Sequence, residues 1–374
     1  MRDVKINEIP VKILGRTDPE AYPIPLFWNH SGVEVNCTGS ELWINLEVDC
    51  DFYEPWVYVE INGSFFSRQM LLKDTKSLCL YRSMTFGTVK NVRFYRDLQA
   101  MEDESLSLLV KGFSTDGEFK EVGERKVKLE FIGDSITSGE GTYGAKEDTD
   151  WTSMYMSSSR NYASYIEKAL EGEARLISQG GWGVYTGWDN DIRHNLPSIY
   201  EKISGVSGGE KNEKLGALKL NDFSLWQPDA VIVNLGTNDN SGFNQPPFEI
   251  EGKGSFKLYK NEDGSFCEED TEKIELAIIS FLKMIRRNNP LALIVWTYGM
   301  LGNDLTLYIV DAINRYRKET GDLKVHFLTL PDTTGETIGS HGHPGLKAHI
   351  QAGKILGEFL AGKLGLEFTE PELN

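Results

Sequence analysis

The sequence predicts a chain of two parts: a small antiparallel β-sandwich over residues 1–124 and an α/β domain with a parallel sheet over residues 125–374. In the first part, apolar residues alternate with polar ones in short, closely spaced runs, without a long helical pattern. In the second part, strand-like and helix-like segments alternate, which is typical of a parallel sheet with helices on both faces. A length of 374 residues fits about two domains.

The sandwich is predicted from runs such as residues 42–46, 56–61 and 91–95, which have the alternation of half-buried strands. Asn62 and Gly63 directly follow the second of these runs. Since both residue types tolerate positive φ, this pair predicts a two-residue hairpin turn.

The α/β domain is predicted from apolar segments of two lengths. The expected strands span residues 127–132, 176–177, 230–235, 292–297 and 325–330, and the expected helices span residues 162–170, 274–285, 305–316 and 346–360. Serines at 157–159 are candidate caps for the first of these helices. Polar stretches at 189–222 and 240–268 interrupt the alternation, and we expect them to form long loops of the kind that often bind ligands.

Composition limits the classes of partner. A net charge of −17 argues against nucleic acid and against an anionic membrane surface, because both attract an excess of Lys and Arg. No apolar run approaches the roughly 20 residues of a membrane span. The N-terminal residues lack the apolar stretch of a secretion signal, so we expect a cytoplasmic protein.

The cysteines are Cys37, Cys50, Cys79 and Cys267, and their spacing matches no metal motif. We expect them to be free thiols, which favours a reducing compartment. We therefore expect no metal and no cofactor, and the sequence leaves the oligomeric state open.

Three loops that follow predicted strands carry candidate chemical groups. Residues 133–137 read Gly-Asp-Ser-Ile-Thr after the first strand, which places the Ser135 hydroxyl where it can face a ligand. Gly181 lies in a glycine-rich loop after the second strand, where backbone N–H groups are accessible. Asn238 follows the third strand, and its side-chain N–H can donate to a developing oxyanion. Taken singly, each group is better explained as a cap or turn residue.

A fourth loop carries His343 just before the last expected helix. The following residue, Pro344, disfavours helical dihedrals at His343, so this imidazole is expected in a loop where it can act as a base. His341 lies two residues earlier, and such a pair can also indicate a metal site, but the sequence shows no third ligand.

Together, these four loops resemble the SGNH hydrolase superfamily, also called the GDSL-type esterases, over about residues 127–361. The resemblance implies a three-layer α/β/α fold and an acyl-enzyme mechanism. Ser135 is then the nucleophile and His343 the general base. The oxyanion hole is then formed by the N–H groups of Ser135 and Gly181 and by the Asn238 side chain.

The sequence departs from this family at Ser340, where an aspartate normally precedes the catalytic histidine by three residues. A backbone carbonyl, Ser340 itself or a distant carboxylate such as Asp332 remain the alternatives for orienting His343. This departure resembles carbohydrate esterase family 2, in which a jelly-roll β-sandwich precedes the hydrolase domain and several members use a Ser-His dyad. Residues 93–96, 99–101 and 298–302 are also similar to that family.

The resemblance implies a serine esterase that removes short acyl groups, mainly acetyl, from O-acylated carbohydrates. Trp182, Tyr185, Trp188 and Tyr298 are candidates for stacking on sugar rings, with core packing as the alternative for each. The expected partner is thus a small-molecule or oligosaccharide ester. The alternatives are a lipase, thioesterase or lysophospholipase that acts on longer acyl chains, and a carbohydrate-binding protein whose hydrolase domain is weak or inactive.

Overall fold

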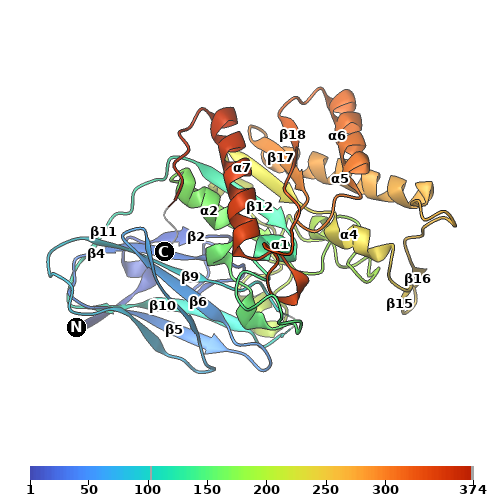
Figure 1. Ribbon diagram of the computed structural model, residues 1–374. Coiled ribbons are helices and arrows are strands. Elements are labelled where there is room, and N and C mark those ends of the chain that lie inside the picture. The colour runs from blue at the N-terminus through green and yellow to red at the C-terminus, as the bar shows by residue number, and fades with distance from the viewer. Residues whose placement is uncertain (102, 372–374) are drawn as a thin grey trace. The chain divides into compact units, whose positions relative to one another are not determined.

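The computed structural model describes residues 1–101 and 103–371, and its chain forms two compact units (Figure 1). The first unit contains Met1–Arg125 together with Tyr200–Asn221, and the second contains Lys126–Ile199 and Asp222–Pro371. The segment Tyr200–Asn221 lies inside the range that we expected for the α/β domain. The division into domains at residues 124 and 125 stays a prediction.

Hydrogen bonds explain why Tyr200–Asn221 groups with the first unit. The Arg16 guanidinium donates to the backbone carbonyls of Tyr200 and Lys202, and the Trp28 indole donates to the Ile203 carbonyl at 2.7 Å. These bonds join residues that are more than 170 positions apart, so no local pattern in the sequence could reveal them.

The first unit is built from two antiparallel sheets, as predicted. One sheet has the order β1-β10-β5-β8, with β3 paired to β10; its strands are β1 Arg2–Lys5, β3 Ile24–Pro25, β5 Leu42–Asp49, β8 Ser77–Tyr81 and β10 Ser107–Thr115. The other has the order β11-β4-β9-β6-β7, with β2 paired to β4; its strands are β2 Lys12–Leu14, β4 Gly32–Cys37, β6 Trp56–Ile61, β7 Ser64–Met70, β9 Lys90–Arg96 and β11 Phe119–Lys120. Asn62 and Gly63 have φ values of 53° and 83° between β6 and β7, which confirms the predicted hairpin turn.

The second unit is organised around a fully parallel sheet of order β13-β12-β14-β17-β18. Its strands are β12 Lys128–Gly133, β13 Glu173–Ser178, β14 Ala230–Asn234, β17 Leu293–Tyr298 and β18 Val325–Thr329. Its longer helices are α2 Tyr162–Ala169, α5 Glu268–Asn288, α6 Thr306–Thr320 and α7 Leu346–Leu364. These elements confirm the predicted α/β architecture. Numbered by their place in the chain, the strands lie across the sheet in the order 2-1-3-4-5, so the switch point where such folds bind ligands lies at the carboxyl ends of β12 and β14.

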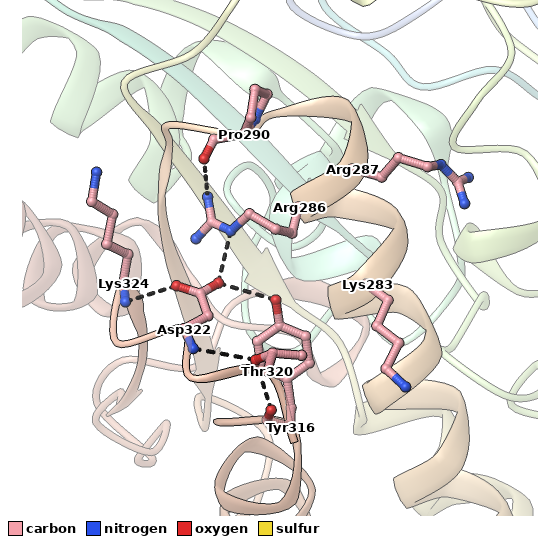
Figure 2. A pocket seen from close by; sticks show the side chains of 8 residues that line it. All are labelled: Lys283, Arg286, Arg287, Pro290, Tyr316, Thr320, Asp322 and Lys324. Atoms are coloured by element: carbon pink, nitrogen blue, oxygen red, sulfur yellow. Dashed lines mark hydrogen bonds and ion pairs between the residues drawn. The ribbon is translucent and has the colours of Figure 1, made fainter. Parts of the chain in front are cut away.

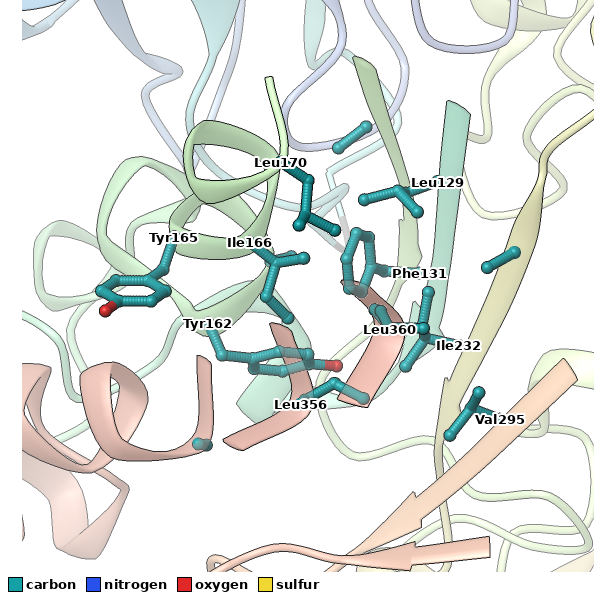
Figure 3. Packing of buried hydrophobic residues seen from close by; sticks show 14 of the residues in the cluster. Leu129, Phe131, Tyr162, Tyr165, Ile166, Leu170, Ile232, Val295, Leu356 and Leu360 are labelled. Atoms are coloured by element: carbon teal, nitrogen blue, oxygen red, sulfur yellow. The ribbon is translucent and has the colours of Figure 1, made fainter. Parts of the chain in front are cut away.

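The helices cover both faces of this sheet. Figure 1 shows α2 beside α7, and α5 beside α6, and these pairs pack against each other. Figure 3 shows Ile166 of α2 and Leu360 of α7 next to Phe131 of the sheet. On the other face, the rings of Phe281 in α5 and Trp296 in β17 meet edge to face, with centroids 6.4 Å apart. Burying each such side chain contributes about 1.5–3 kcal/mol, so this two-sided core holds the strand ends in place.

The structure differs from the predictions at the N-terminal ends of α2 and α5. Asn161, rather than a serine at 157–159, caps α2, since its side chain accepts from the Ser164 N–H at 2.9 Å. Ser157 instead caps the short 3-10 turn Ser158–Arg160. Helix α5 begins earlier than residue 274 because its polar first turn carries acidic residues, which favour a helix N-terminus but show no apolar periodicity.

The long polar stretches contain short elements of their own. The first holds the 3-10 turn Leu196–Ser198 and the helix α3 Glu210–Lys214, and the second holds the hairpin of β15 Phe248–Ile250 and β16 Gly254–Phe256. Within residues 1–101 and 103–371, no helix has the combined length and apolarity needed to cross a membrane.

Candidate active site

Ser135 is presented at the carboxyl end of β12 by a sharp turn into the short helix α1, Ser135–Ser138. A Cβ atom on Gly133 would lie 2.0 Å from Thr137 Oγ1, so only glycine fits at that point of the turn. Asp134 caps α1, because its side chain accepts from the Ile136 N–H at 3.0 Å. The Ser135 hydroxyl is thereby fixed at a helix N-terminus, with 6% of the residue exposed.

The imidazole of His343 meets this hydroxyl. Ser135 Oγ and His343 Nε2 lie 2.9 Å apart, although 208 positions separate the two residues. Backbone bonds brace the histidine loop: Gly339 N donates to His343 O at 2.7 Å, and His343 N donates to Ser340 O at 3.1 Å. Gly141 packs against the loop so closely that a Cβ atom there would lie 2.8 Å from His343 Cβ. The pair predicted from the sequence is therefore brought together in a rigid setting.

A backbone carbonyl contacts the other ring nitrogen of His343. His343 Nδ1 lies 2.9 Å from His341 O, so Nδ1 carries the proton and Nε2 is left to accept from Ser135. Ser340 donates its hydroxyl to Tyr143 O at 2.8 Å instead. The exposed Asp332 carboxylate accepts from the N–H groups of Gly302 and Thr333. Ser340 and Asp332 are thus engaged elsewhere, and the carbonyl is the alternative that contacts His343.

Glu140 also belongs to this site, although the sequence did not reveal it. Its Oε1 atom lies 2.6 Å from His341 Nδ1 and 3.5 Å from His343 Nδ1, and only 8% of its side chain is exposed. The two imidazole rings stack with centroids 5.3 Å apart and an interplanar angle of 7°. His341 reaches this position through left-handed dihedrals, φ 52° and ψ 30°. The only sequence signal for Glu140 is its place between two glycines shortly after Ser135.

Three hydrogen-bond donors are available for an oxyanion. The Ser135 N–H is a first-turn helix donor without an intrahelical acceptor. Gly181 has φ 78°, and within the described part of the chain its N–H has no acceptor. Asn238 lies in α4, Thr237–Gly242, and its Nδ2 atom donates to Asp134 Oδ2 at 3.2 Å and to Trp182 O at 3.0 Å. These bonds fix the Asn238 amide, and an oxyanion would share the N–H groups of this amide with the acceptors on Asp134 and Trp182.

Two buried carboxylates support the donors. Asp239 accepts from the N–H groups of Val184, Tyr185 and Thr186 at 2.7–3.1 Å and so fixes the loop that follows Gly181. Burial raises the pKa of both Asp239 and Asp134, and the pKa of Asp134 reaches about 7 because the nearby charges of Asp239 and Glu140 add to the effect.

The predicted aromatic residues divide into two groups. Trp188 is 50% exposed and lies next to Gly181, since a Cβ atom on that glycine would be 3.1 Å from the indole Cδ1. Trp182 is half-buried and stacks on His194, and Tyr185 is also half-buried. Tyr298 is 0% exposed and packs against the start of α4, so core packing is the alternative that applies to this ring, and it presents no face to a sugar.

A separate hollow of about 430 Å³ lies at the amino ends of β17 and β18 (Figure 2). Ser135, by contrast, lies at the carboxyl end of β12. Figure 2 shows Arg286 directed at Asp322, and their Nε and Oδ2 atoms lie 2.7 Å apart. The Tyr316 hydroxyl donates to the same carboxylate at 3.0 Å. This network ties the end of α5 to the loop before β18, and we assign it a structural role.

One group of described residues is close enough to share a metal ion. Glu140, His341 and His343 each offer one ligand atom, and these atoms lie within 4.8 Å of one another. Glu140 thus supplies the third ligand that the sequence did not reveal for the two histidines. In chemical terms, the site combines a hydroxyl, an imidazole within hydrogen-bond distance of it and N–H donors on nearby loops, and acyl transfer requires groups of these kinds.

Comparison with known proteins agrees with this chemistry. The model of the GDSL-like Lipase/Acylhydrolase family matches residues 131–337. The chain is similar to the solved acetyl xylan esterase Est2A from the rumen bacterium Butyrivibrio proteoclasticus, with 56% identity, a TM-score of 0.95, and coverage of 97% of this chain and 98% of that one. These findings confirm the resemblance inferred from the four loops.

Two further likenesses are weaker. A family two carbohydrate esterase from Clostridium thermocellum, solved with cellohexaose, shares the fold with a TM-score of 0.76 and 24% identity, over 95% of this chain and 99% of that one. The curated Cellulase/esterase CelE from Acetivibrio thermocellus is 28% identical over 244 residues, which is 64% of this chain. This chain spans 26% of that relative's length.

Proposed function

Because the chain belongs to the GDSL-like lipase/acylhydrolase family, we propose that it is a serine esterase that removes acetyl groups from O-acetylated plant polysaccharides or their oligosaccharides. The observation that carries this proposal is the 2.9 Å contact between Ser135 Oγ and His343 Nε2. The 56% identity to an acetyl xylan esterase over nearly the whole chain supports an acetylated xylan as the substrate class.

In the first step, Ser135 Oγ attacks the carbonyl carbon of the acetyl group while its proton passes to His343 Nε2. The imidazolium that forms keeps its Nδ1–H on the His341 carbonyl. The Glu140 carboxylate, 3.5 Å from Nδ1, stabilises this positive charge from a position that differs from the usual aspartate.

The negative charge develops on the former carbonyl oxygen. We assign its binding to the N–H groups of Ser135 and Gly181 and to the Asn238 amide, and each donor of this kind is typically worth about 3–4 kcal/mol of barrier. Two carboxylates hold these donors in place. Asp134 accepts a hydrogen bond from the Asn238 amide, and Asp239 fixes the loop that follows Gly181.

Breakdown of the intermediate completes the reaction. His343 returns its proton to the sugar oxygen, which leaves as the free hydroxyl and gives an acetyl-Ser135 ester. His343 then takes a proton from a water molecule, the water oxygen attacks the acetyl carbon, and acetate leaves as Ser135 regains its proton.

The surroundings of the nucleophile favour a sugar ester over a long-chain ester. Trp188 offers an exposed indole beside Gly181, and sugar rings stack on such faces. The joined Ser135 and His343 side chains argue against an inactive hydrolase domain that only binds carbohydrate.

The proposal is tested by acetate release from acetylated xylo-, manno- and gluco-oligosaccharides, with p-nitrophenyl acetate and p-nitrophenyl octanoate as reference esters. We expect acetate release by the wild-type protein, preference for the short reference ester, and loss of both activities in Ser135→Ala. Activity that survives in Ser135→Ala would refute the assigned nucleophile, and a marked preference for octanoate would refute the acetylated substrate.

The cellular compartment of the protein is also part of this proposal. The four cysteines are free, with Cys37 buried, which favours a reducing compartment and hence the cytoplasm. A cytoplasmic esterase would act on acetylated oligosaccharides after their uptake.

A further inference from the structure

The cluster of Glu140, His341 and His343 has a composition that acyl transfer alone does not require. Acyl transfer uses one imidazole and one acceptor for its Nδ1–H, and His341 O already supplies that acceptor at 2.9 Å. The His341 side chain has no part in this step, yet its Nδ1 atom lies 2.6 Å from the same Glu140 carboxylate that faces His343.

The cluster brings three potential metal ligands together. Glu140 Oε1 faces Nδ1 of both histidines, and one ligand atom from each residue lies within 4.8 Å of the others. The carboxylate is buried, whereas 36% of the His341 side chain is exposed, so an ion can enter from the His341 side. Three protein ligands leave one tetrahedral position for water.

We propose that Glu140, His341 and His343 bind a divalent transition-metal ion such as Zn²⁺, and that the bound ion switches off the esterase. The binding part stands on the cluster alone, and the switching part rests on the proposed function.

The tautomer of His343 explains the inhibition. A neutral imidazole binds a metal through the nitrogen that lacks a proton. If His343 coordinates through Nδ1, its single proton must move to Nε2, which then donates toward Ser135 Oγ and can no longer accept the hydroxyl proton. The ion would also displace the Nδ1–H bond to His341 O, and its positive charge would oppose the imidazolium that acylation requires.

The ligand chemistry selects the ion. Imidazole nitrogens with one carboxylate suit Zn²⁺, Ni²⁺ and Cu²⁺. Mg²⁺ and Ca²⁺ prefer an all-oxygen set and are not expected to inhibit.

The first measurement is metal binding without catalysis. The full-length Ser135→Ala protein, stripped with a chelator, is titrated with ZnCl₂ by calorimetry, alone and combined with His341→Gln or with the control His326→Gln. We expect one Zn²⁺ site, weakened at least about tenfold by His341→Gln and unchanged by His326→Gln. Equal affinity in all three proteins would overturn the proposal, since it would place the ion elsewhere, for example on a free cysteine.

The second measurement is inhibition of p-nitrophenyl acetate hydrolysis, with each variant compared with its own metal-free rate. We expect Zn²⁺ to inhibit the wild-type and His326→Gln proteins, EDTA to restore both rates, and MgCl₂ to have no effect. A fully active Zn²⁺-loaded wild-type protein would refute the switch, whereas a metal-free protein without activity would refute the esterase and leave the binding result intact.

Discussion

Replacing Glu140 with Gln tests whether this carboxylate stabilises the imidazolium of His343. Gln keeps the size of the side chain and an oxygen that can accept from His341, but it removes the negative charge. The charge matters only while His343 is protonated, that is, during acylation and deacylation. We therefore expect Glu140→Gln to lower kcat and to leave KM within about twofold.

The size of the effect follows from the 3.5 Å between Glu140 Oε1 and His343 Nδ1. At an effective dielectric constant of about 20, two unit charges at this distance attract by roughly 5 kcal/mol. Two features lower this attraction: Glu140 also accepts from the His341 N–H, and 18% of the His343 side chain is exposed to solvent. We therefore expect Glu140 to stabilise the His343 imidazolium by a net value of about 2–3 kcal/mol. This corresponds to a decrease in kcat of about 30- to 150-fold.

The assay is the steady-state hydrolysis of p-nitrophenyl acetate and of an acetylated xylo-oligosaccharide, with EDTA present to exclude metal effects. Glu147→Gln is the matched control, because this side chain lies in the same loop and is 72% exposed. A Glu140→Gln protein that folds normally and retains wild-type kcat would show that the His341 carbonyl alone orients and stabilises His343.

Three other substitutions probe the donors, the aromatic surface and the buried acid. Asn238→Ala removes one oxyanion donor, so kcat should fall about 10²- to 10³-fold while the thermal stability of the protein stays similar. A normal kcat would exclude Asn238 from the oxyanion hole. Trp188→Ala should raise KM for acetylated xylo-oligosaccharides about five- to tenfold, as expected for a loss of about 1–1.5 kcal/mol of stacking. Hydrolysis of p-nitrophenyl acetate, which has no sugar ring, should stay nearly unchanged. Equal losses on both substrates would contradict a role of Trp188 in sugar binding. The pKa of Asp134 rises from 3.8 to about 7 in the folded chain. The folded state therefore holds the proton of the Asp134 carboxyl group more tightly than the unfolded state does, and the stability that this contributes is lost as pH rises between about 4 and 7. Asp134→Asn should therefore flatten the pH dependence of the unfolding free energy measured in denaturant between pH 5 and pH 8, and an unchanged slope would show that Asp134 does not titrate in this range.

The regular elements were predictable because their signal is local. Apolar periodicity located all five strands of the parallel sheet, and the Asn62-Gly63 pair located a hairpin turn, since each depends on a few neighbouring residues. The meeting of Ser135 and His343 also followed from local facts, because the loop after the first strand and the loop before the last helix lie at the same edge of such a sheet.

What the sequence did not reveal depends on distant contacts. Glu140 joins the site only because left-handed dihedrals at His341 turn that ring toward a loop 200 positions earlier in the chain. Tyr298 is the last residue of β17, at the edge of the sheet where ligand-binding residues lie, yet packing against the start of α4 buries it. The grouping of Tyr200–Asn221 with the β-sandwich rests on side-chain bonds to backbone carbonyls, for which composition gives no signal.

Trapping the acyl-enzyme intermediate shows whether Ser135 and His343 together transfer an acyl group. The protein is mixed with p-nitrophenyl acetate, quenched in acid within milliseconds, digested and examined by mass spectrometry. We expect one added acetyl group on the peptide that contains Ser135, and none in Ser135→Ala or His343→Ala. An acetyl group on any other residue, or turnover without an acetylated enzyme, would contradict this mechanism.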